Sequence, residues 1–170
     1  MMKKFITTLC FVCFTSLMAT AQEDTRIGGF IAYGSEIKSV GVGANAEFPI
    51  INNLTIAPSF IYYLPKDEDI IKTTIFEING NANYYFMNDD SIGFYGLAGI
   101  NYTSVKVEVE DFGFGFGFGG ASSSEGKIGL NLGAGANFNI GKNWMPFAEL
   151  KYVLSDYDQL VLLAGVKFNL

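Results

Sequence analysis

The sequence predicts an all-β fold in which eight antiparallel strands, in up-and-down order, close into a transmembrane β-barrel. Three observations predict this fold. Apolar and polar side chains alternate with a period of two over most of the chain. Turn residues recur between the alternating segments. After residue 21, no apolar run reaches the roughly 18 residues that a membrane-spanning helix needs.

The first 21 residues have the features of a secretory signal peptide. Lys3 and Lys4 precede an apolar run over residues 5–18, and Ala19-Thr20-Ala21 forms a small-x-small cleavage site. We therefore expect residues 1–21 to be removed by cleavage after Ala21. The exported protein is then a single barrel domain over residues 22–170.

The composition excludes several kinds of chemistry. The chain has 170 residues, of which 49% are hydrophobic and 16% charged, and it contains no histidine. Cys10 and Cys13 both lie in the expected signal peptide, so the exported domain has neither a thiol nor an imidazole. A cysteine nucleophile, a Ser-His-Asp triad and a Cys/His zinc site are therefore excluded. We expect no enzyme activity, catalytic residue, cofactor or metal.

The net charge of −6 disfavours nucleic acid as a partner. Removal of Lys3 and Lys4 with the signal peptide makes the exported chain still more acidic.

Eight segments carry the alternation and are the predicted strands. They span residues 26–34, 40–50, 54–64, 74–86, 92–102, 128–140, 144–154 and 160–170. In the last seven, no even-numbered position is charged and Thr74 is the only polar one. The odd-numbered positions carry the charges, most of the asparagines and many glycines. Each strand therefore has one apolar and one polar face, although the phase of the first strand stays open.

The apolar face could line the inside of a soluble lipocalin-like barrel or face lipid around a membrane barrel. The polar face is mostly Asn and Gly, whereas a soluble exterior is roughly a quarter to a third charged. Aromatic residues on the apolar face also gather towards both strand ends, as at the two membrane interfaces. They are Phe48, Tyr84, Phe86, Phe94, Phe138, Trp144 and Phe168 at one end, and Phe60, Tyr62, Phe76, Tyr102 and Tyr152 at the other. Both observations favour the membrane barrel.

The connections predict which end faces outwards. Residues 51–53, 87–91 and 141–143 form short turns, whereas the alternate connections are mostly longer and more charged. Those connections are 35–39, 65–73, 103–127 and 155–159. Short periplasmic turns and longer outer loops are the rule for such barrels, so both termini are expected in the periplasm. Pro58 lies in mid-strand, where we expect a bulge or a broken ladder bond.

Several segments resemble a known family. They are 94–99 (FYGLAG), 133–138 (GAGANF), 146–152 (PFAELKY) and 164–168 (AGVKF). With these segments the chain resembles the small eight-stranded outer-membrane barrels of the OmpA/OmpX type, over residues 22–170. The resemblance implies a protein of the outer membrane of a Gram-negative bacterium. We expect a monomer in contact with outer-membrane lipids and lipopolysaccharide.

Five charged residues fall on the polar, lumen-facing side of the strands. They are Glu47, Glu77, Glu149, Lys151 and Lys167. The interior of an eight-stranded barrel is only wide enough for side chains to fill it, and buried charges persist when paired. We therefore expect these side chains to meet as a salt-bridged plug. The alternative is that they line an ion or proton path.

The segment 111–120 (DFGFGFGFGG) alternates Phe with Gly, so that an extended conformation presents Phe112, Phe114, Phe116 and Phe118 on one face. Residues 105–110 also alternate, which predicts that the fifth strand continues beyond the membrane into a protruding hairpin. The segment could be a loop lying over the barrel mouth or in the lipid headgroups. It could instead belong to an exposed sheet edge that captures a protein partner by strand addition, as expected for the OmpX type.

The remaining charges near the outer loops predict a solvated, mildly acidic rim. They include Asp67, Glu68, Asp69, Asp156 and Asp158. The sequence thus favours a structural or surface-interaction protein, active in adhesion or binding, whose loop 103–127 meets the outside. The first alternative is a narrow porin-like channel for ions or small solutes, and the second is a soluble lipocalin-like carrier.

Overall fold

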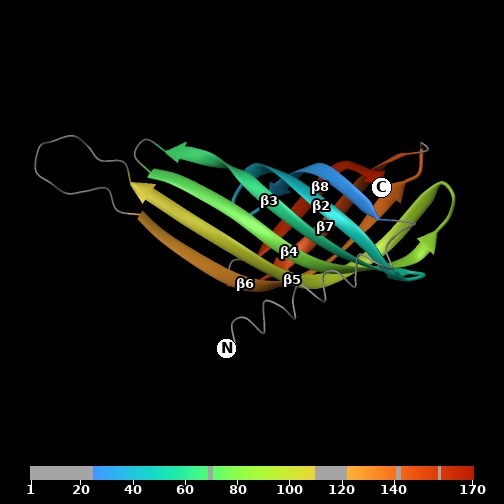
Figure 1. The fold of residues 1–170 in the computed structure, drawn as a ribbon. Coiled ribbons are helices and arrows are strands. Elements are labelled where there is room, and N and C mark those ends of the chain that lie inside the picture. Colours follow the sequence, from blue (N-terminus) through green and yellow to red (C-terminus); the bar gives the residue numbers. More distant parts are fainter. Residues whose placement is uncertain (1–24, 69–70, 110–121, 141–142, 157) are drawn as a thin grey trace, which may run out of the picture.

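The computed structural model describes residues 25–68, 71–109, 122–140, 143–156 and 158–170, which form one closed barrel (Figure 1). The eight strands are β1 (Arg26–Gly34), β2 (Ser39–Ile51), β3 (Leu54–Glu68), β4 (Ile71–Asn88), β5 (Ile92–Val109), β6 (Ser122–Phe138), β7 (Trp144–Leu154) and β8 (Gln159–Asn169). In the described part of the chain, no helix has the length and apolar character to cross a membrane. The predicted all-β class and strand number are confirmed.

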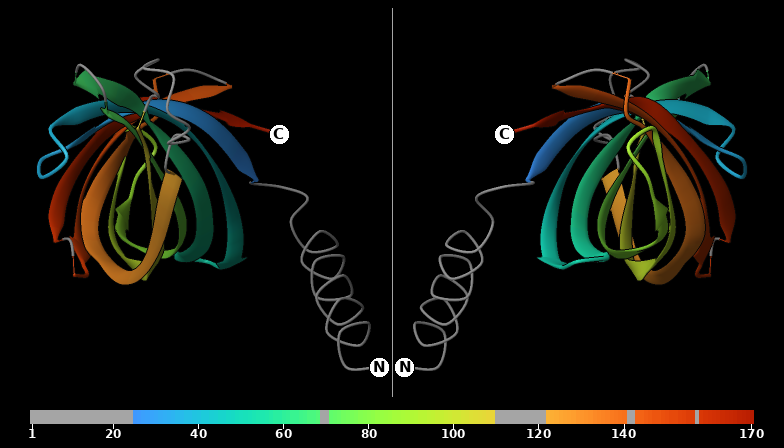
Figure 2. Two further views of the ribbon diagram at one scale, coloured as in Figure 1. Left: turned by 90° about the vertical axis from the view of Figure 1, so that its left-hand side faces the viewer. Right: turned by 90° about the vertical axis from the view of Figure 1, so that its right-hand side faces the viewer.

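Each strand pairs antiparallel with its neighbours in sequence, and β1 also pairs with β8 to close the ring. Arg26 lies opposite both Glu47 and Asn169, so the start of β1 and the end of β8 lie at the same end of the barrel. Seen along its axis, the barrel is a ring of strands around a central lumen (Figure 2). The predicted up-and-down order is therefore confirmed.

The register determines which side chains enter the lumen. From β2 to β8 the odd-numbered positions are mostly the more buried ones, as the alternation predicts. Arg26 pairs with Glu47, and directly opposite residues share a sheet face, so the even-numbered positions of β1 face the lumen. Phe30 and Ala32 are accordingly buried, while Ile31 is exposed. The structure thus settles the phase of the first strand.

The outer wall of the barrel is apolar. Ile31, Ile100 and Leu162 are each more than half exposed, and such residues recur on every strand. Two bands of aromatic side chains flank them. Tyr84, Phe86, Phe94, Phe138, Trp144 and Phe168 are exposed near the end that holds the short turns, and Phe60, Tyr102 and Tyr152 lie towards the other end. Such a wall is suited to lipid and would be unfavourable in water.

Four neighbouring strands extend beyond the rest of the barrel. β3 to β6 have 15, 18, 18 and 17 residues, whereas β1, β2, β7 and β8 have 9, 13, 11 and 11. In Figure 1 the ends of β3 to β6 project together as a curved sheet on the left. We call this part, residues 64–68, 71–75, 103–109 and 122–129, the protruding sheet.

Residues 103–109 are strand, which confirms that the fifth strand continues past residue 102 as the alternation of residues 105–110 predicts, although the same residues were also counted within the connection 103–127. Residues 122–127, and residues 65–68 and 71–73 of the predicted connection 65–73, are strand as well, so those loop boundaries were wrong. The membrane-length apolar alternation ends near Tyr102 and Leu64, but the backbone pairing continues. Val107 lies opposite both Thr73 and Ser123, which shows that the ladder runs on without an apolar outer face. The predicted strand 128–140 likewise ends at Phe138.

Pro58 does not cause a bulge. It lies opposite Gly80 in an uninterrupted register with β4. On its other side, the pairs Asn45–Ser59 and Phe48–Ile56 keep one register, but no pair joins β2 and β3 between them. Of the two expected outcomes, a bulge or a broken ladder bond, the second is confirmed: the ladder between β2 and β3 is locally interrupted where proline lacks an N–H donor.

Candidate functional site

The lumen near the turn end is organised around Glu47, which is 1% exposed. Lys167 Nζ lies 2.7 Å from Glu47 Oε2, and Arg26 Nη1 lies 3.8 Å from Oε1. Thr55 donates a hydrogen bond to Oε1 at 2.8 Å, and the Tyr85 hydroxyl donates to the same oxygen. Strands β1, β2, β3, β4 and β8 thus all contribute to one buried ion cluster.

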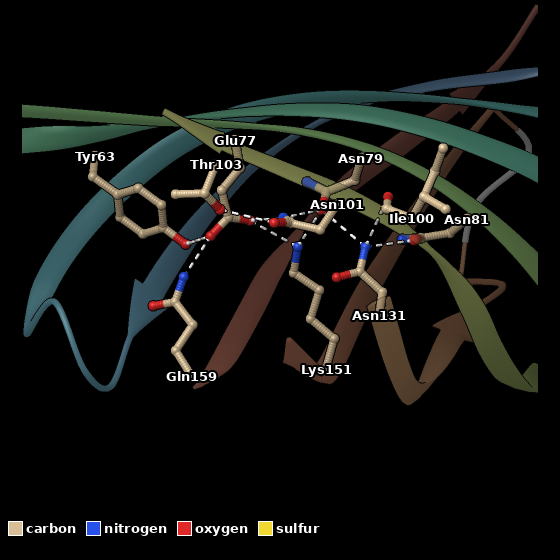
Figure 3. Close-up of polar contacts among 10 residues, drawn as sticks. All are labelled: Tyr63, Glu77, Asn79, Asn81, Ile100, Asn101, Thr103, Asn131, Lys151 and Gln159. Carbon is tan, nitrogen blue, oxygen red and sulfur yellow. Dashed lines mark hydrogen bonds and ion pairs between the residues drawn. The ribbon is translucent and has the colours of Figure 1, made fainter. Parts of the chain in front are cut away.

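A second cluster lies around Glu77, nearer the outer end. Lys151 Nζ is 2.9 Å from Glu77 Oε2, and both side chains are at most 1% exposed. Tyr63 and Gln159 donate to Glu77 Oε1 at 2.9 and 2.6 Å. Figure 3 shows these groups converging from strands on different sides of the lumen. The carboxylate is therefore held by a cation and by neutral donors at once.

Asparagines extend the Glu77 cluster along the lumen (Figure 3). Asn79 Oδ1 accepts hydrogen bonds from Lys151 at 2.8 Å and from Asn131 at 2.9 Å. Asn101 donates to Asn79 at 2.8 Å and to Glu77 at 3.3 Å. Together with Lys151, these amides cross-link β4, β5, β6 and β7.

The five predicted lumen charges therefore do not form one network. Glu47 pairs with Lys167 and Glu77 pairs with Lys151, at two levels of the barrel. Glu149 accepts a hydrogen bond from the Tyr95 hydroxyl at 3.0 Å, and in the described residues it is in no ion pair with either lysine. Lys167 Nζ also lies 5.1 Å from the centre of the Tyr95 ring, which links Glu149 indirectly to the first cluster.

The sequence prediction missed an apolar cluster within the lumen. Its members come from β1, β3, β7 and β8. They are Phe30, Ala32, Ile61, Tyr63, Phe147, Val153, Val161 and Leu163. Most occupy odd-numbered positions, so the parity signal was present, but only the charges and asparagines on that face were weighed. The lumen is thus divided into an apolar sector and a polar one.

Some lumen amides have buried polar atoms without a hydrogen-bond partner in the described part of the chain. They are Asn45 Oδ1, Asn79 Nδ2, Asn83 Oδ1, Asn131 Oδ1 and Gln159 Oε1. Among the same described residues, no group of His, Cys, Asp and Glu could hold a metal ion.

The protruding sheet has two unequal edges. β6 makes its outermost pair with β7 at Leu130–Leu154, so among the described residues the segment 122–129 pairs only with β5. Ser123, Ser124 and Gly126 on this edge are exposed. The opposite edge, on β3, is irregular, because its register shifts between Tyr63 and Lys66 and because Pro65 lies within the shift. Proline and bulges both hinder the pairing of a further strand.

Charges at the base of the β6 edge form an exposed ion cluster. Lys127 Nζ lies 2.8 Å from Glu125 Oε1 and 3.1 Å from Asp156 Oδ2. Its hydrogen bonds to Glu125 and Asp156 raise the pKa of the Lys127 ammonium above its usual range. Asp158 accepts a hydrogen bond from the Ser155 backbone N–H at 2.8 Å.

The other predicted loop residues lie outside what the structure describes. This holds for the expected cleavage site after Ala21 and for Phe112, Phe114, Phe116, Phe118 and Asp69. The side chains of Asp67 and Glu68 are also outside the described set.

The comparison with known families decides the classification. The sequence model of the outer membrane protein beta-barrel domain matches residues 8–169. The chain belongs to this family. An outer-membrane β-barrel agrees with the closed ring of strands and with the exposed apolar wall. The chain is therefore a protein of the bacterial outer membrane, and the alternative of a soluble lipocalin-like carrier was wrong.

Solved structures of outer-membrane barrels share the fold of this family member. The attachment invasion locus protein Ail of Yersinia pestis, in complex with the heparin analogue sucrose octasulfate, is 20% identical, with a TM-score of 0.62; the match covers 87% of this chain and 97% of that one. The N-terminal β-barrel domain of Pseudomonas aeruginosa OprF is 15% identical, with a TM-score of 0.62 and coverages of 88% and 98%.

A major outer membrane protein of Thermus thermophilus is 8% identical, with a TM-score of 0.69 and coverages of 88% and 100%. No curated protein matches the chain. At these identities the solved structures establish the fold alone.

Proposed function

We propose that this outer-membrane barrel is a non-enzymatic surface-interaction protein that binds a partner through its protruding sheet. The observation that carries the proposal is the unpaired outer edge of β6, over residues 122–129. The lumen, filled by the ion pairs of Glu47 with Lys167 and of Glu77 with Lys151, would serve to hold the barrel rigid.

The β6 edge is suited to strand addition. A strand that pairs on one side only leaves every second N–H and C=O group directed to solvent, where an extended segment of another protein can form the next ladder. Small exposed residues, Ser123, Ser124 and Gly126, leave room for an approaching backbone. Because Pro65 and the bulge protect the β3 edge, the partner would be captured at β6.

The Phe/Gly segment follows directly from the tip of β5 and leads into β6. Four rings at Phe112, Phe114, Phe116 and Phe118 would give an added strand an apolar surface beside its hydrogen-bonding edge. The segment would thereby supply affinity, while the β6 edge fixes the orientation of the partner.

The charge of the chain indicates the class of partner. Ail, whose fold is similar, was crystallised with a heparin analogue. The present chain has a net charge of −6 and an isoelectric point near 4.5, so a sulfated polyanion would be repelled. A protein partner with an exposed strand fits this surface better.

Adhesion of bacteria that display the chain tests the proposal. Ser123→Pro and Ser124→Pro form a matched pair, because neighbouring residues of a strand direct their N–H groups to opposite sides. The variant at the residue whose N–H faces the free edge removes a hydrogen-bond donor there, and it should lower attachment to an epithelial cell monolayer severalfold. The variant at the neighbouring residue, whose N–H faces β5, removes a hydrogen bond to β5 instead. Heat-modifiability on a gel verifies that both barrels fold.

Two loop variants complete the test. Deletion of residues 112–120, and replacement of Phe112, Phe114, Phe116 and Phe118 by Ser at constant length, should both reduce attachment to the monolayer and to polystyrene. Unchanged attachment in the two proline variants and in the two loop variants would exclude a binding role for the protruding sheet.

The second candidate is a narrow pore for ions or small solutes. It is favoured by the buried polar atoms in the lumen that lack partners in the described residues, such as Asn83 Oδ1 and Asn131 Oδ1, because water could satisfy them. The two ion pairs oppose it, since they span the lumen at two levels.

A further inference from the structure

A cavity of about 340 Å³ lies at the outer mouth of the barrel, between the turn 35–38 and the concave face of the protruding sheet. Its volume is at the lower end of the roughly 300–1,000 Å³ that is usual for small-ligand sites. We call it the mouth cavity. It lies on the lumen-facing side of the sheet, and Ser123 and Glu125 of the β6 edge are part of its lining.

The walls of the mouth cavity are apolar and aliphatic. Ile75, Val105 and Val107 continue the odd-numbered, lumen-facing side of β4 and β5 beyond the membrane. Ile37 reaches in from the turn between β1 and β2. Both Ile37 and Ile75 pack against the apolar lumen cluster, so the floor of the cavity is closed towards the barrel interior. The cavity is therefore a cup that opens outwards.

The polar groups of the mouth cavity are mainly acceptors. Glu36 lies in an exposed turn, and the Glu125 side chain is 58% exposed although its Oε1 is paired with Lys127. The Thr103 hydroxyl already donates its proton to Asn101 at 2.8 Å. Lys127 is shared between Glu125 and Asp156, and the charged residues that line the cavity itself, Glu36 and Glu125, are both acidic.

A buried acceptor lies at the base of the cavity. Gln159 is 5% exposed, and its Nε2 donates to Glu77 at 2.6 Å. Its Oε1 has no hydrogen-bond partner among the described residues, and in Figure 3 it points away from Glu77.

We propose that the mouth cavity binds an alkylammonium group. The aliphatic stem would lie against Ile37, Ile75, Val105 and Val107, and the ammonium protons would meet the carboxylate oxygens of Glu36 and Glu125. A neutral alcohol lacks the charge for the carboxylates, and an anion would be repelled by them. The group could come from a free aliphatic amine or from a lysine side chain of a partner protein. This site goes beyond the proposed role of the β6 edge and does not depend on it.

Methyl NMR of the exported chain in lipid nanodiscs tests the proposal. Isoleucine and valine methyl groups are labelled, and n-butylammonium, n-butanol, butyrate and Nα-acetyl-lysine methylamide are titrated separately. n-Butylammonium should give saturable shifts confined to the methyl groups of Ile37, Ile75, Val105 and Val107. n-Butanol and butyrate should give none that saturate. The lysine derivative distinguishes the two sources: tighter binding than n-butylammonium indicates a protein side chain, and weaker binding indicates a free amine.

Variants separate a specific site from general attraction to an acidic surface. Glu36→Gln and Glu125→Gln should each weaken n-butylammonium binding by about tenfold. Val105→Phe, which fills the cup without changing charge, should abolish it. Asp90→Asn, which removes the same charge from an exposed position at the opposite end of the barrel, should leave binding unchanged.

Folding of each variant is verified by heat-modifiability. The absence of saturable shifts, equal binding of n-butanol, or equal weakening by Asp90→Asn would each overturn the proposal. A loss of cell attachment in Ser124→Pro, a variant at a β6 residue outside the cavity lining, with normal amine binding would separate the two sites.

Discussion

The buried side chains of Glu77 and Lys151 show how the barrel tolerates charge in its interior. Each is at most 1% exposed, and every strong contact of the carboxylate is with a donor on another strand. A buried ion pair stabilises little relative to apolar side chains of the same shape, but loss of one partner leaves an uncompensated charge. The replacement of Glu77 or Lys151 alone is therefore unfavourable.

The variant Lys151→Met should lower the free energy of unfolding by about 3–5 kcal/mol, because the buried Glu77 side chain then loses the cation that compensates it. Urea unfolding of the barrel in lipid vesicles measures the effect. Glu77→Gln combined with Lys151→Met should recover most of the loss. Lys127→Met, at the exposed cluster, should have a much smaller effect. Equal effects of Lys151→Met and Lys127→Met would show that the buried pair is not special.

At the scale of elements, β5 and β6 are fitted to one another by a ring lying over a glycine. Tyr95 lies opposite Gly135, and a Cβ atom at Gly135 would lie 2.4 Å from the Tyr95 ring atom Cζ. The neighbouring Gly96 points to the other face, where a Cβ atom would have nothing within 4 Å. The two glycines lie at adjacent levels of the β5–β6 pair, but a Cβ atom has room at Gly96 and clashes at Gly135.

Gly135→Ala should therefore destabilise the barrel by about 1–3 kcal/mol, because the Tyr95 ring must move and its hydrogen bond to Glu149 is strained or lost. Gly96→Ala is the matched control and should change stability by less than about 0.5 kcal/mol. Urea unfolding and the rate of folding into vesicles report both effects. If Gly135→Ala and Gly96→Ala change the stability equally, the close packing of the Tyr95 ring on Gly135 does not determine the effect of a side chain at position 135.

The agreement between the predicted and observed strand bounds also differs from strand to strand. β1 and β7 have the predicted bounds, because turn residues and the apolar alternation end together there. β6 begins at Ser122 rather than at residue 128, because residues 122–127 have no apolar alternation to indicate a strand, whereas the continuation of β5 was indicated by the alternating residues 105–110. The pairing of Glu77 with Lys151, 74 residues away, depends on strand register, which alternation alone does not give.

Within the lumen, parity identified the correct charged residues but not their partners. The phenolic groups of Tyr63, Tyr85 and Tyr95 each donate to a carboxylate; all three occupy odd-numbered, lumen-facing positions, but the sequence prediction did not weigh them. The mouth cavity was also not predicted, because it forms only when the turn 35–38 closes over the strand extensions of β4 to β6.

At the scale of the whole molecule, the wall and the lumen give the barrel its structure, whereas the outer end is the part that partners can reach. Its wall is apolar and suited to lipid, and its lumen is occupied by two ion clusters and an apolar sector. The features that remain available to partners are at the outer end, on the protruding sheet and around the mouth cavity. We accordingly propose a closed scaffold that acts at its outer surface.

Single-channel recording of the purified barrel in a planar lipid bilayer tests this central claim most directly. A lumen closed by the Glu47–Lys167 and Glu77–Lys151 pairs predicts no sustained conductance steps, with insertion verified independently by protease protection. The variant Glu77→Ala with Lys151→Ala, which removes one level of the closure, is the sensitivity control. Sustained, uniform steps from the unmodified barrel would contradict the closed scaffold and support the pore.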